Sequence, residues 1–174
     1  MTATPLILPF DGHHPVIADS AWVAPTATLI GHVHLGDEAS IFYGAVLRAD
    51  VDSITIGARS NLQDNVTVHC DAGRPAVVGT GVSVGHAAVL HGCVIEDDCL
   101  VGMSATVLND AVVGAGSLIA AGAVVLEGSI IPPGSLVAGV PANVLRALTE
   151  EERAQLKDNA TRYETLAALH RELA

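Results

Sequence analysis

Aliphatic residues recur at every sixth position over most of the chain. Nineteen positions, all Val, Ile or Leu, follow this spacing: Val23, Leu29, Leu35, Ile41, Leu47, Ile56, Leu62, Val68, Val78, Val84, Leu90, Ile95, Val101, Val107, Val113, Ile119, Val125, Ile131 and Val137. Four residues after each aliphatic position the side chain is usually small, as at Ala27, Ala45 and Ala105. A period of six fits neither an α-helix nor a simple strand alternation. It fits a short strand and a turn, with the aliphatic residue inside and the small residue at the corner.

Three such hexads make one triangular coil of about eighteen residues, so the pattern predicts an all-β solenoid of about six coils, a parallel β-helix of hexapeptide repeats. Each coil buries its apolar row only against the next coil. Two steps are longer than six, from Leu47 to Ile56 and from Val68 to Val78. These steps predict insertions of about three and four residues that project as loops from the corners.

The pattern changes after Val137. The segment Ala-Gly-Val-Pro-Ala at 138–142 stops the coil, because Gly and Pro interrupt regular structure. Thr149-Glu-Glu-Glu152 then has the form of a capping box, which predicts a helix from about Thr149 to Leu173 packed on the outside of the solenoid. One side of this helix carries Leu156, Tyr163, Leu166, His170 and Leu173. We therefore expect a β-helix domain over 1–148 and a C-terminal α-helix over 149–174.

Composition and charge narrow the classes of partner. Half of the residues are apolar but only 3% are aromatic, which suits a narrow, repetitive core of aliphatic residues. The formal net charge is −11 with eight Lys and Arg, so we expect no nucleic-acid partner. We also expect no membrane segment or signal peptide, since Gly, Asp, Asn or His interrupts every apolar run. Cys70, Cys93 and Cys99 are expected as small core residues in a reducing cytoplasm.

The repeat places two of the eight histidines in one column. His69 and His91 directly follow the inward residues Val68 and Leu90, whose hexads are three apart. They therefore belong to the same face on successive coils, roughly 4.8 Å apart. Arg48 has the same position three hexads earlier, in the coil beneath His69.

His86 falls on a different face from this column. It lies two residues after Val84, and Asp64, with Gln63 as its neighbour, has the matching position one coil earlier. In a threefold-symmetric trimer, His69 and His91 of one chain could meet His86 of the next. Three neutral imidazoles with one open position form the ligand set of a catalytic zinc site. The alternative is that these histidines are only solvated or hydrogen-bonded surface residues.

The chain resembles the γ-class carbonic anhydrase family over nearly its whole length. The resemblance is carried by Val-Leu-Arg-Ala-Asp at 46–50, Ser-Asn-Leu-Gln-Asp at 60–64, Val-Thr-Val-His at 66–69, Val-Gly-His at 84–86 and Val-Leu-His-Gly-Cys at 89–93. It implies a left-handed β-helix, a homotrimer and the reversible hydration of carbon dioxide to bicarbonate. It also implies that His69, His86 and His91 are zinc ligands shared between subunits, although imidazole suits Fe²⁺ or Co²⁺ as well.

The resemblance implies roles for further polar residues. Arg48 and Asp50 are expected beside the metal, with Asp64 near it across the subunit interface. Asn61 and Gln63 are expected to line the pocket and to orient solvent or bicarbonate.

The sequence departs from the family's fully active form at the proton-export route. The segment from Cys70 to Val77 is short, with Asp71 as its single acid, and Val51 stands where that form has a glutamate. This chain is thus of the short-loop type. Tyr163 is expected either near a neighbouring site, as in some short-loop relatives, or in packing.

Two other functions fit the same pattern. Hexapeptide-repeat acyltransferases share the solenoid and the Gly-Val-Pro-Ala ending at 139–142, which allows a coenzyme A-linked acyltransferase or thioesterase. A non-catalytic trimer that keeps a metal for assembly is the third possibility.

Overall fold

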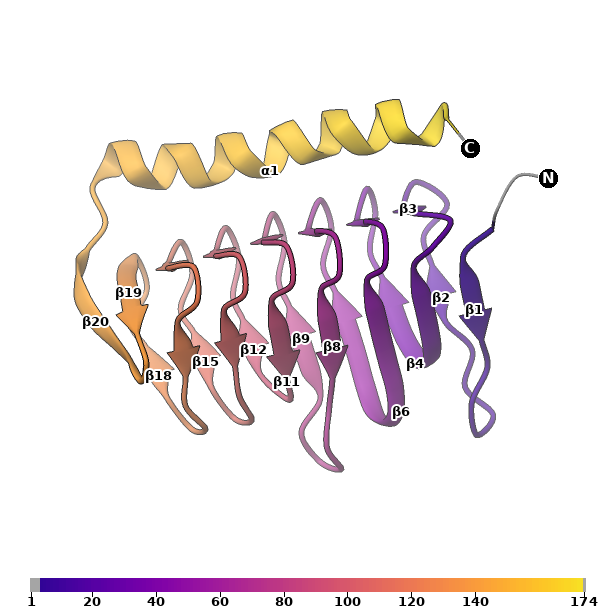
Figure 1. The fold of residues 1–174 in the computed structure, drawn as a ribbon, viewed down its shortest axis with the longest axis horizontal. Helices are drawn as coiled ribbons and strands as arrows, with labels where there is room; N and C mark the ends of the chain where they lie inside the picture. The colour runs from indigo at the N-terminus through magenta and orange to yellow at the C-terminus, as the bar shows by residue number, and fades with distance from the viewer. Residues whose placement is uncertain (1–3, 174) are drawn as a thin grey trace.

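Short parallel strands stack along one axis to form the body of the molecule, and one long helix runs along it (Figure 1). The computed structural model describes residues 4–173. The predicted fold, a β-helix of hexapeptide repeats with a C-terminal α-helix, is confirmed.

The solenoid has three faces. The first face contains β1 (Leu6–Leu8), the start of β4 (Thr28–Leu35), the start of β6 (Val46–Ile56), β8 (Thr67–His69), β11 (Val89–His91), β14 (Thr106–Val107) and β17 (Val124–Val125). The second contains β2 (Val16–Ile17), the ends of β4 and β6, β9 (Ala76–Val78), β12 (Val94–Ile95), β15 (Val112–Val113) and β18 (Ile130–Ile131). The third contains β3 (Trp22–Val23), β5 (Ser40–Ile41), β7 (Asn61–Leu62), β10 (Ser83–Val84), β13 (Leu100–Val101), β16 (Leu118–Ile119) and β19 (Ser135–Gly139).

The stack begins one turn earlier than the six-residue spacing indicates. Ile7 pairs with Leu29, and Ile17 pairs with Leu35, so about seven turns lie within the described residues. The prediction of about six coils starting at Val23 was therefore wrong. The cause is the turn at 11–14, which separates Ile7 from Ile17 and hides the period at this end.

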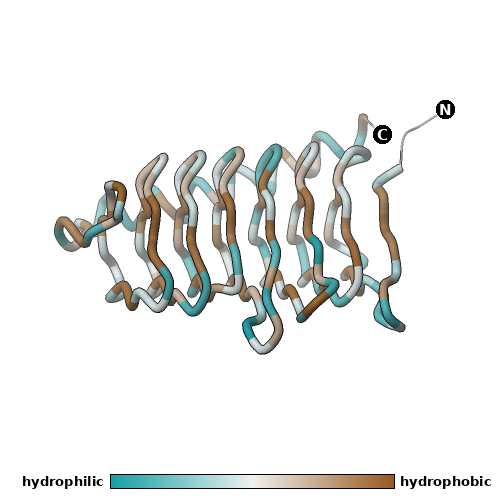
Figure 2. The backbone as a smooth tube through the Cα atoms, turned by 60° about the horizontal axis from the view of Figure 1, so that its bottom comes forward, coloured by the Kyte–Doolittle hydropathy of each residue, from teal (hydrophilic) through white to brown (hydrophobic). Residues whose placement is uncertain are grey.

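The repeated aliphatic side chains fill the interior. Leu47, Val68 and Leu90 are fully buried, and so are the small corner residues Ala45 and Ala105. Figure 2 shows apolar segments recurring from coil to coil along the axis. The three cysteines are also buried and unpaired, as expected. Burial raises the pKa of Cys93 to about 12 and that of Cys99 to about 11, which makes both thiols poor nucleophiles.

The two predicted insertions differ in form. The residues added between Leu47 and Ile56 stay within strand β6, which runs unbroken from the first face to the second, so a separate loop was a wrong expectation there. The second insertion does form a loop, and it projects between β8 and β9 (Figure 1). An antiparallel bridge between Asp71 and Arg74 closes this loop.

The chain reverses at Gly139, whose positive φ of 106° suits a residue without a side chain. β20 (Ala142–Ala147) then pairs antiparallel with β19 and covers the edge that β19 would otherwise leave open. The sequence pattern predicted the end of the coil but not this last strand.

Helix α1 (Glu150–Arg171) lies along the third face, against β3, β5, β7 and β10. Its predicted capping box is present: Glu152 N donates to Thr149 Oγ1 at 3.2 Å, and Thr149 N donates to Glu152 Oε2 at 2.9 Å. Leu156 is buried, but Leu173 is 78% exposed. The placement of Leu173 on the packed side was wrong because the helix ends at Arg171. Among the described residues, no helix combines the length and apolar character needed to cross a membrane.

Candidate metal centre

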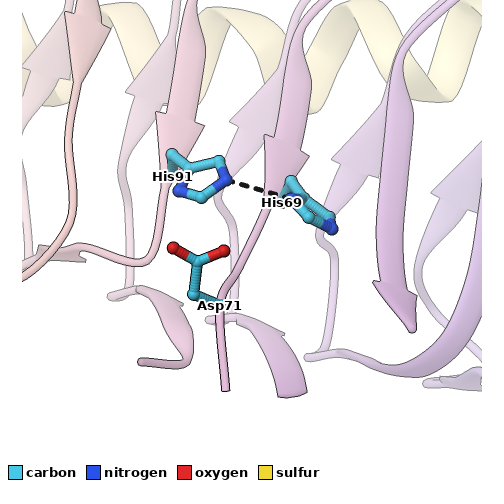
Figure 3. Close-up of side chains that lie close together, drawn as sticks. All are labelled: His69, Asp71 and His91. Carbon is cyan, nitrogen blue, oxygen red and sulfur yellow. Dashed lines mark hydrogen bonds between the residues drawn. The ribbon is translucent and has the colours of Figure 1, made fainter. Parts of the chain in front are cut away.

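Two histidines face each other on the first face of the solenoid. Because β8 and β11 pair in parallel, His91 lies directly opposite His69. His69 Nδ1 and His91 Nε2 are 3.0 Å apart, and Figure 3 shows the two nitrogens pointing toward one another. Two nitrogens bound to one tetrahedral Zn²⁺ at about 2.0–2.1 Å would be separated by about 3.3 Å. A small widening of this contact therefore lets both imidazoles bind one ion.

Arg48 and Asp50 lie beside this pair, on strand β6. Leu47 pairs with Val68, which places Arg48 next to His69. Arg48 Nη1 donates to Asp50 Oδ2 at 2.5 Å, and His69 Nε2 lies 3.1 Å from Asp50 Oδ1. Burial alone would raise the pKa of Asp50, but the hydrogen bonds from Arg48 and His69 outweigh it and lower that pKa below 3.8. Asp50 is thus held as a carboxylate that orients the His69 ring.

Asp71 and Asn109 complete the surroundings of His91. His69, Asp71 and His91 each offer a ligand atom within 4.8 Å of the others. Asn109 Oδ1 lies 2.8 Å from His91 Nδ1, and Asn109 Nδ2 donates to Asp71 Oδ2 at 2.8 Å. Sequence reasoning assigned neither residue to the site. The strand register could have indicated Asn109, because Val107 pairs with Leu90 and so puts Asn109 one coil beyond Gly92.

The remaining predicted site residues form a second cluster, at the corner between the third and first faces. His86 follows β10, and its Nδ1 lies 2.9 Å from Asp64 Oδ2. Gln63 Nε2 donates to Asn61 Oδ1 at 3.2 Å, and the buried Asn61 donates to Ser83 Oγ at 2.9 Å.

Tyr163 reaches this second cluster from helix α1. Its ring packs edge-on against Phe42, with ring centres 5.4 Å apart. Burial, and after it the charge of Asp64, raises the pKa of the Tyr163 hydroxyl. Tyr163, His86 and Gln63 line one groove of about 380 Å³ whose other lining residues are mainly apolar. Tyr163 therefore takes part in packing and also lines the groove beside His86.

The two clusters do not meet within one chain. Among the described residues, the cluster of possible metal ligands contains His69, Asp71 and His91 but not His86. His86 is instead paired with Asp64, at another corner of the prism. A site built from all three histidines therefore needs a second copy of the chain.

Known proteins resemble this chain over most of its length. A family model described as bacterial transferase hexapeptide (six repeats) matches residues 92–127. A probable carbonic anhydrase of Methanocaldococcus jannaschii is 55% identical over 152 residues, which is 87% of this chain and 96% of that protein. A mitochondrial gamma carbonic anhydrase 3 of Arabidopsis thaliana is 54% identical over 162 residues, 90% of this chain and 63% of the plant protein.

The chain belongs to the γ-class carbonic anhydrase family. It is accordingly an enzyme related to carbonic anhydrases, which are lyases, and the family is one of metalloenzymes. A crystal structure described as a putative acetyltransferase of Bacillus cereus superposes on this γ-class chain with a TM-score of 0.96. The two sequences are 38% identical, and the match covers 98% of this chain and 99% of that one.

Proposed function

We propose that this protein catalyses the reversible hydration of carbon dioxide to bicarbonate at a zinc site shared between subunits of a homotrimer. The observation that carries this proposal is the His69–His91 pair, whose nitrogens lie 3.0 Å apart on adjacent coils. Membership of the carbonic anhydrase family supports the same chemistry.

The donor set fits zinc. His69 and His91 of one chain, with His86 of the next, would supply three imidazoles and leave a position for solvent. When bound, Zn²⁺ lowers the pKa of its water to roughly 7, which supplies a nucleophile for carbon dioxide at neutral pH. Fe²⁺ or Co²⁺ would suit the same imidazoles. Asp64 supports this role for His86: its carboxylate lies 2.9 Å from Nδ1, which favours a hydrogen on that nitrogen and leaves the Nε2 lone pair available to a metal.

The polar residues around the histidines would position them and the substrate. Asp50 accepts from His69 Nε2 and fixes that ring, while Arg48 holds Asp50 and adds a positive charge that favours bicarbonate. Gln63 is only 6% exposed and lies beside His86, where its amide can orient solvent or bicarbonate. Asn61 holds Gln63 in place. The Tyr163 hydroxyl would add a hydrogen-bond donor on the same side.

A coenzyme A-linked acyltransferase or thioesterase is a second candidate. The groove of about 380 Å³ beside His86, with Gly85, Gly102 and Ala120 in its lining, has room for a short acyl group. The Bacillus cereus relative described as a putative acetyltransferase points the same way. A transferase of this kind would use one histidine as a general base and would leave the His69–His91 pair without a role. We therefore favour the hydration of carbon dioxide.

Metal content and carbon dioxide hydration of anaerobically purified protein test the proposal, with His91→Ala beside the wild type. We expect about one zinc per chain and measurable hydration in the wild type, and loss of both in the variant. Bound metal without hydration would favour an acyl-group enzyme or a non-catalytic, metal-stabilised trimer. Hydrolysis or transfer of a short-chain acyl-coenzyme A by metal-free protein would favour the acyl-group enzyme alone.

The three buried, unpaired thiols suit a reducing compartment, so we place the protein in the cytoplasm as part of this proposal.

A further inference from the structure

His91 has a hydrogen-bond partner on the side away from His69. Its Nδ1 contacts Asn109 Oδ1 at 2.8 Å, and the amide of Asn109 donates to Asp71 Oδ2 at 2.8 Å. These contacts link three different segments: Asp71 from the loop after β8, Asn109 from the turn after β14, and His91 at the end of β11.

The direction of these hydrogen bonds follows from Asp71. A carboxylate only accepts, so the Asn109 group that faces it must be the NH₂. The carbonyl oxygen of Asn109 then faces His91 and can only accept, which requires a hydrogen on His91 Nδ1. In the neutral ring the lone pair therefore lies on Nε2, the nitrogen that faces His69. Asp71 and Asn109 together select the His91 tautomer that is suited to binding a metal on this side.

The surroundings hold the Asn109 amide in one place. Asn109 is only 6% exposed. A Cβ at Gly92 would lie 2.2 Å from Asn109 Oδ1, so the missing side chain at 92 makes room for the amide.

The loop that carries Asp71 is fixed on both sides. Arg74 Nε forms an ion pair with Asp110 Oδ2 at 3.0 Å, and Asp110 lies two coils further along the solenoid. On the other side, Gly73 N donates to Asp52 Oδ2 at 2.8 Å. Asp71 is thereby held within hydrogen-bonding distance of Asn109.

We infer that Asp71 and Asn109 are positioning residues for His91: Asp71 orients the Asn109 amide, and Asn109 fixes the tautomer and ring angle of His91. The inference rests on the proposed function, in which His91 binds the metal. It gives Asp71, the single acid of the short loop, the structural role of positioning the metal ligand His91. The competing assignment is that Asp71 is itself a third ligand, which its proximity to His69 and His91 also allows.

Four variants separate these two assignments, with Zn²⁺ affinity measured by competition with a chromogenic chelator. Asn109→Leu and Asp71→Ala remove the hydrogen bonds that link Asp71, Asn109 and His91. Loss of such a partner typically weakens metal binding by about 10–100-fold. Asp71→Asn keeps an oxygen that can accept from Asn109, so it should bind Zn²⁺ nearly as tightly as the wild type. Asp97→Ala is the matched control, because Asp97 also accepts a hydrogen bond across coils, from Thr80 N, but at the corner between the second and third faces.

A second readout uses metal-free protein. The ¹⁵N shifts of the histidine rings report the tautomer, with His91 assigned by its absence from the spectrum of His91→Ala. We expect the Nδ1–H form in the wild type and in Asp71→Asn, and a mixture of tautomers in Asn109→Leu.

The inference is overturned if Asn109→Leu keeps both the Nδ1–H tautomer and wild-type affinity. It is also overturned if Asp71→Asn loses Zn²⁺ while Asn109→Leu retains it, since that result makes Asp71 a ligand. If the wild type binds Zn²⁺ no better than His91→Ala, the proposed function fails. The tautomer spectra of the metal-free protein then still decide whether Asp71 and Asn109 position His91.

Discussion

At the scale of single residues, Gly92 leaves room for Asn109, whose side chain contacts His91. Gly92 adopts a positive φ of 52°, and its Cα faces the side chain of Asn109. A methyl group there would be strained by the backbone conformation and would collide with Asn109 Oδ1. Movement of Asn109 would in turn release His91 Nδ1.

Gly92→Ala should therefore weaken Zn²⁺ binding by about 10–100-fold, as loss of Asn109 would. Gly116→Ala is the control, because Gly116 also has a positive φ of 64° but nothing within 4 Å of its added Cβ. Both substitutions should cost about 1–2 kcal/mol of stability through the backbone alone. Equal Zn²⁺ affinities in the two variants would contradict the account of this contact.

Part of the site follows from the residue pattern and part does not. The hexad register is enough to place His69, His91 and Arg48 in one column, because strands stack in parallel with no shift between coils. The turn residues are harder to place, since the hydrogen bonds of Asn109 depend on the loop at 71–74. That loop lies outside the repeat, and its shape is fixed by contacts with other coils.

At the scale of elements, the first turn of helix α1 is stabilised by its own side chains. Thr149 and Glu152 bond each other's backbone N–H groups, and Arg146 donates two hydrogen bonds to the Glu152 carboxylate at 2.7 Å. The helix carries Tyr163 to the groove beside His86, so its docking also shapes the candidate site.

Removing the cap should loosen this helix. Thr149→Ala is expected to lower the free energy of unfolding by about 1 kcal/mol, because Glu152 N loses its acceptor, whereas Thr149→Ser should be close to the wild type. Urea denaturation followed by circular dichroism measures the difference. A larger loss in Thr149→Ser than in Thr149→Ala would contradict the role of the hydroxyl.

The same cap predicts a dependence on pH. The hydrogen bonds from Arg146, and after them that from Thr149 N, lower the pKa of Glu152 from 4.5 to about 2. A carboxyl group with a lowered pKa stabilises the folded state above its unfolded value, so this contribution is complete above pH 4.5 and is lost as the pH falls toward about 2. The difference in Tm between wild type and Glu152→Gln should shrink over that range. A difference that stays constant there would contradict the assignment.

The elements themselves were largely predictable, because one period of six determines both strand positions and the buried face. The capping box likewise marked the start of α1. The exceptions are ends and insertions: the early strands at Leu6–Leu8 and Val16–Ile17, the continuity of β6, and the closing strand β20. Each depends on pairing with a neighbouring coil, and local sequence does not encode that pairing.

At the scale of the whole molecule, the candidate ligands are divided between two parts of a rigid prism. His69 and His91 lie on the first face, and His86 lies at the corner beside the third face. The packed, fully buried core leaves no freedom to bring them together within one chain. A cyclic trimer repeats one contact three times, so each interface can join a first face to a neighbour's corner.

Complementation between two inactive variants tests the shared site most directly. His69→Ala keeps the corner with His86, and His86→Ala keeps the pair formed by the other ligands, so each variant alone should bind little zinc. The two variants are combined by co-expression, or by unfolding and reassembly together. Each mixed trimer should regain about one intact interface of the three. Its bound zinc and its rate of carbon dioxide hydration should then be about one third of the wild-type values. Full zinc content in the His86→Ala protein alone, or no recovery in purified mixed trimers, would contradict a site built between subunits.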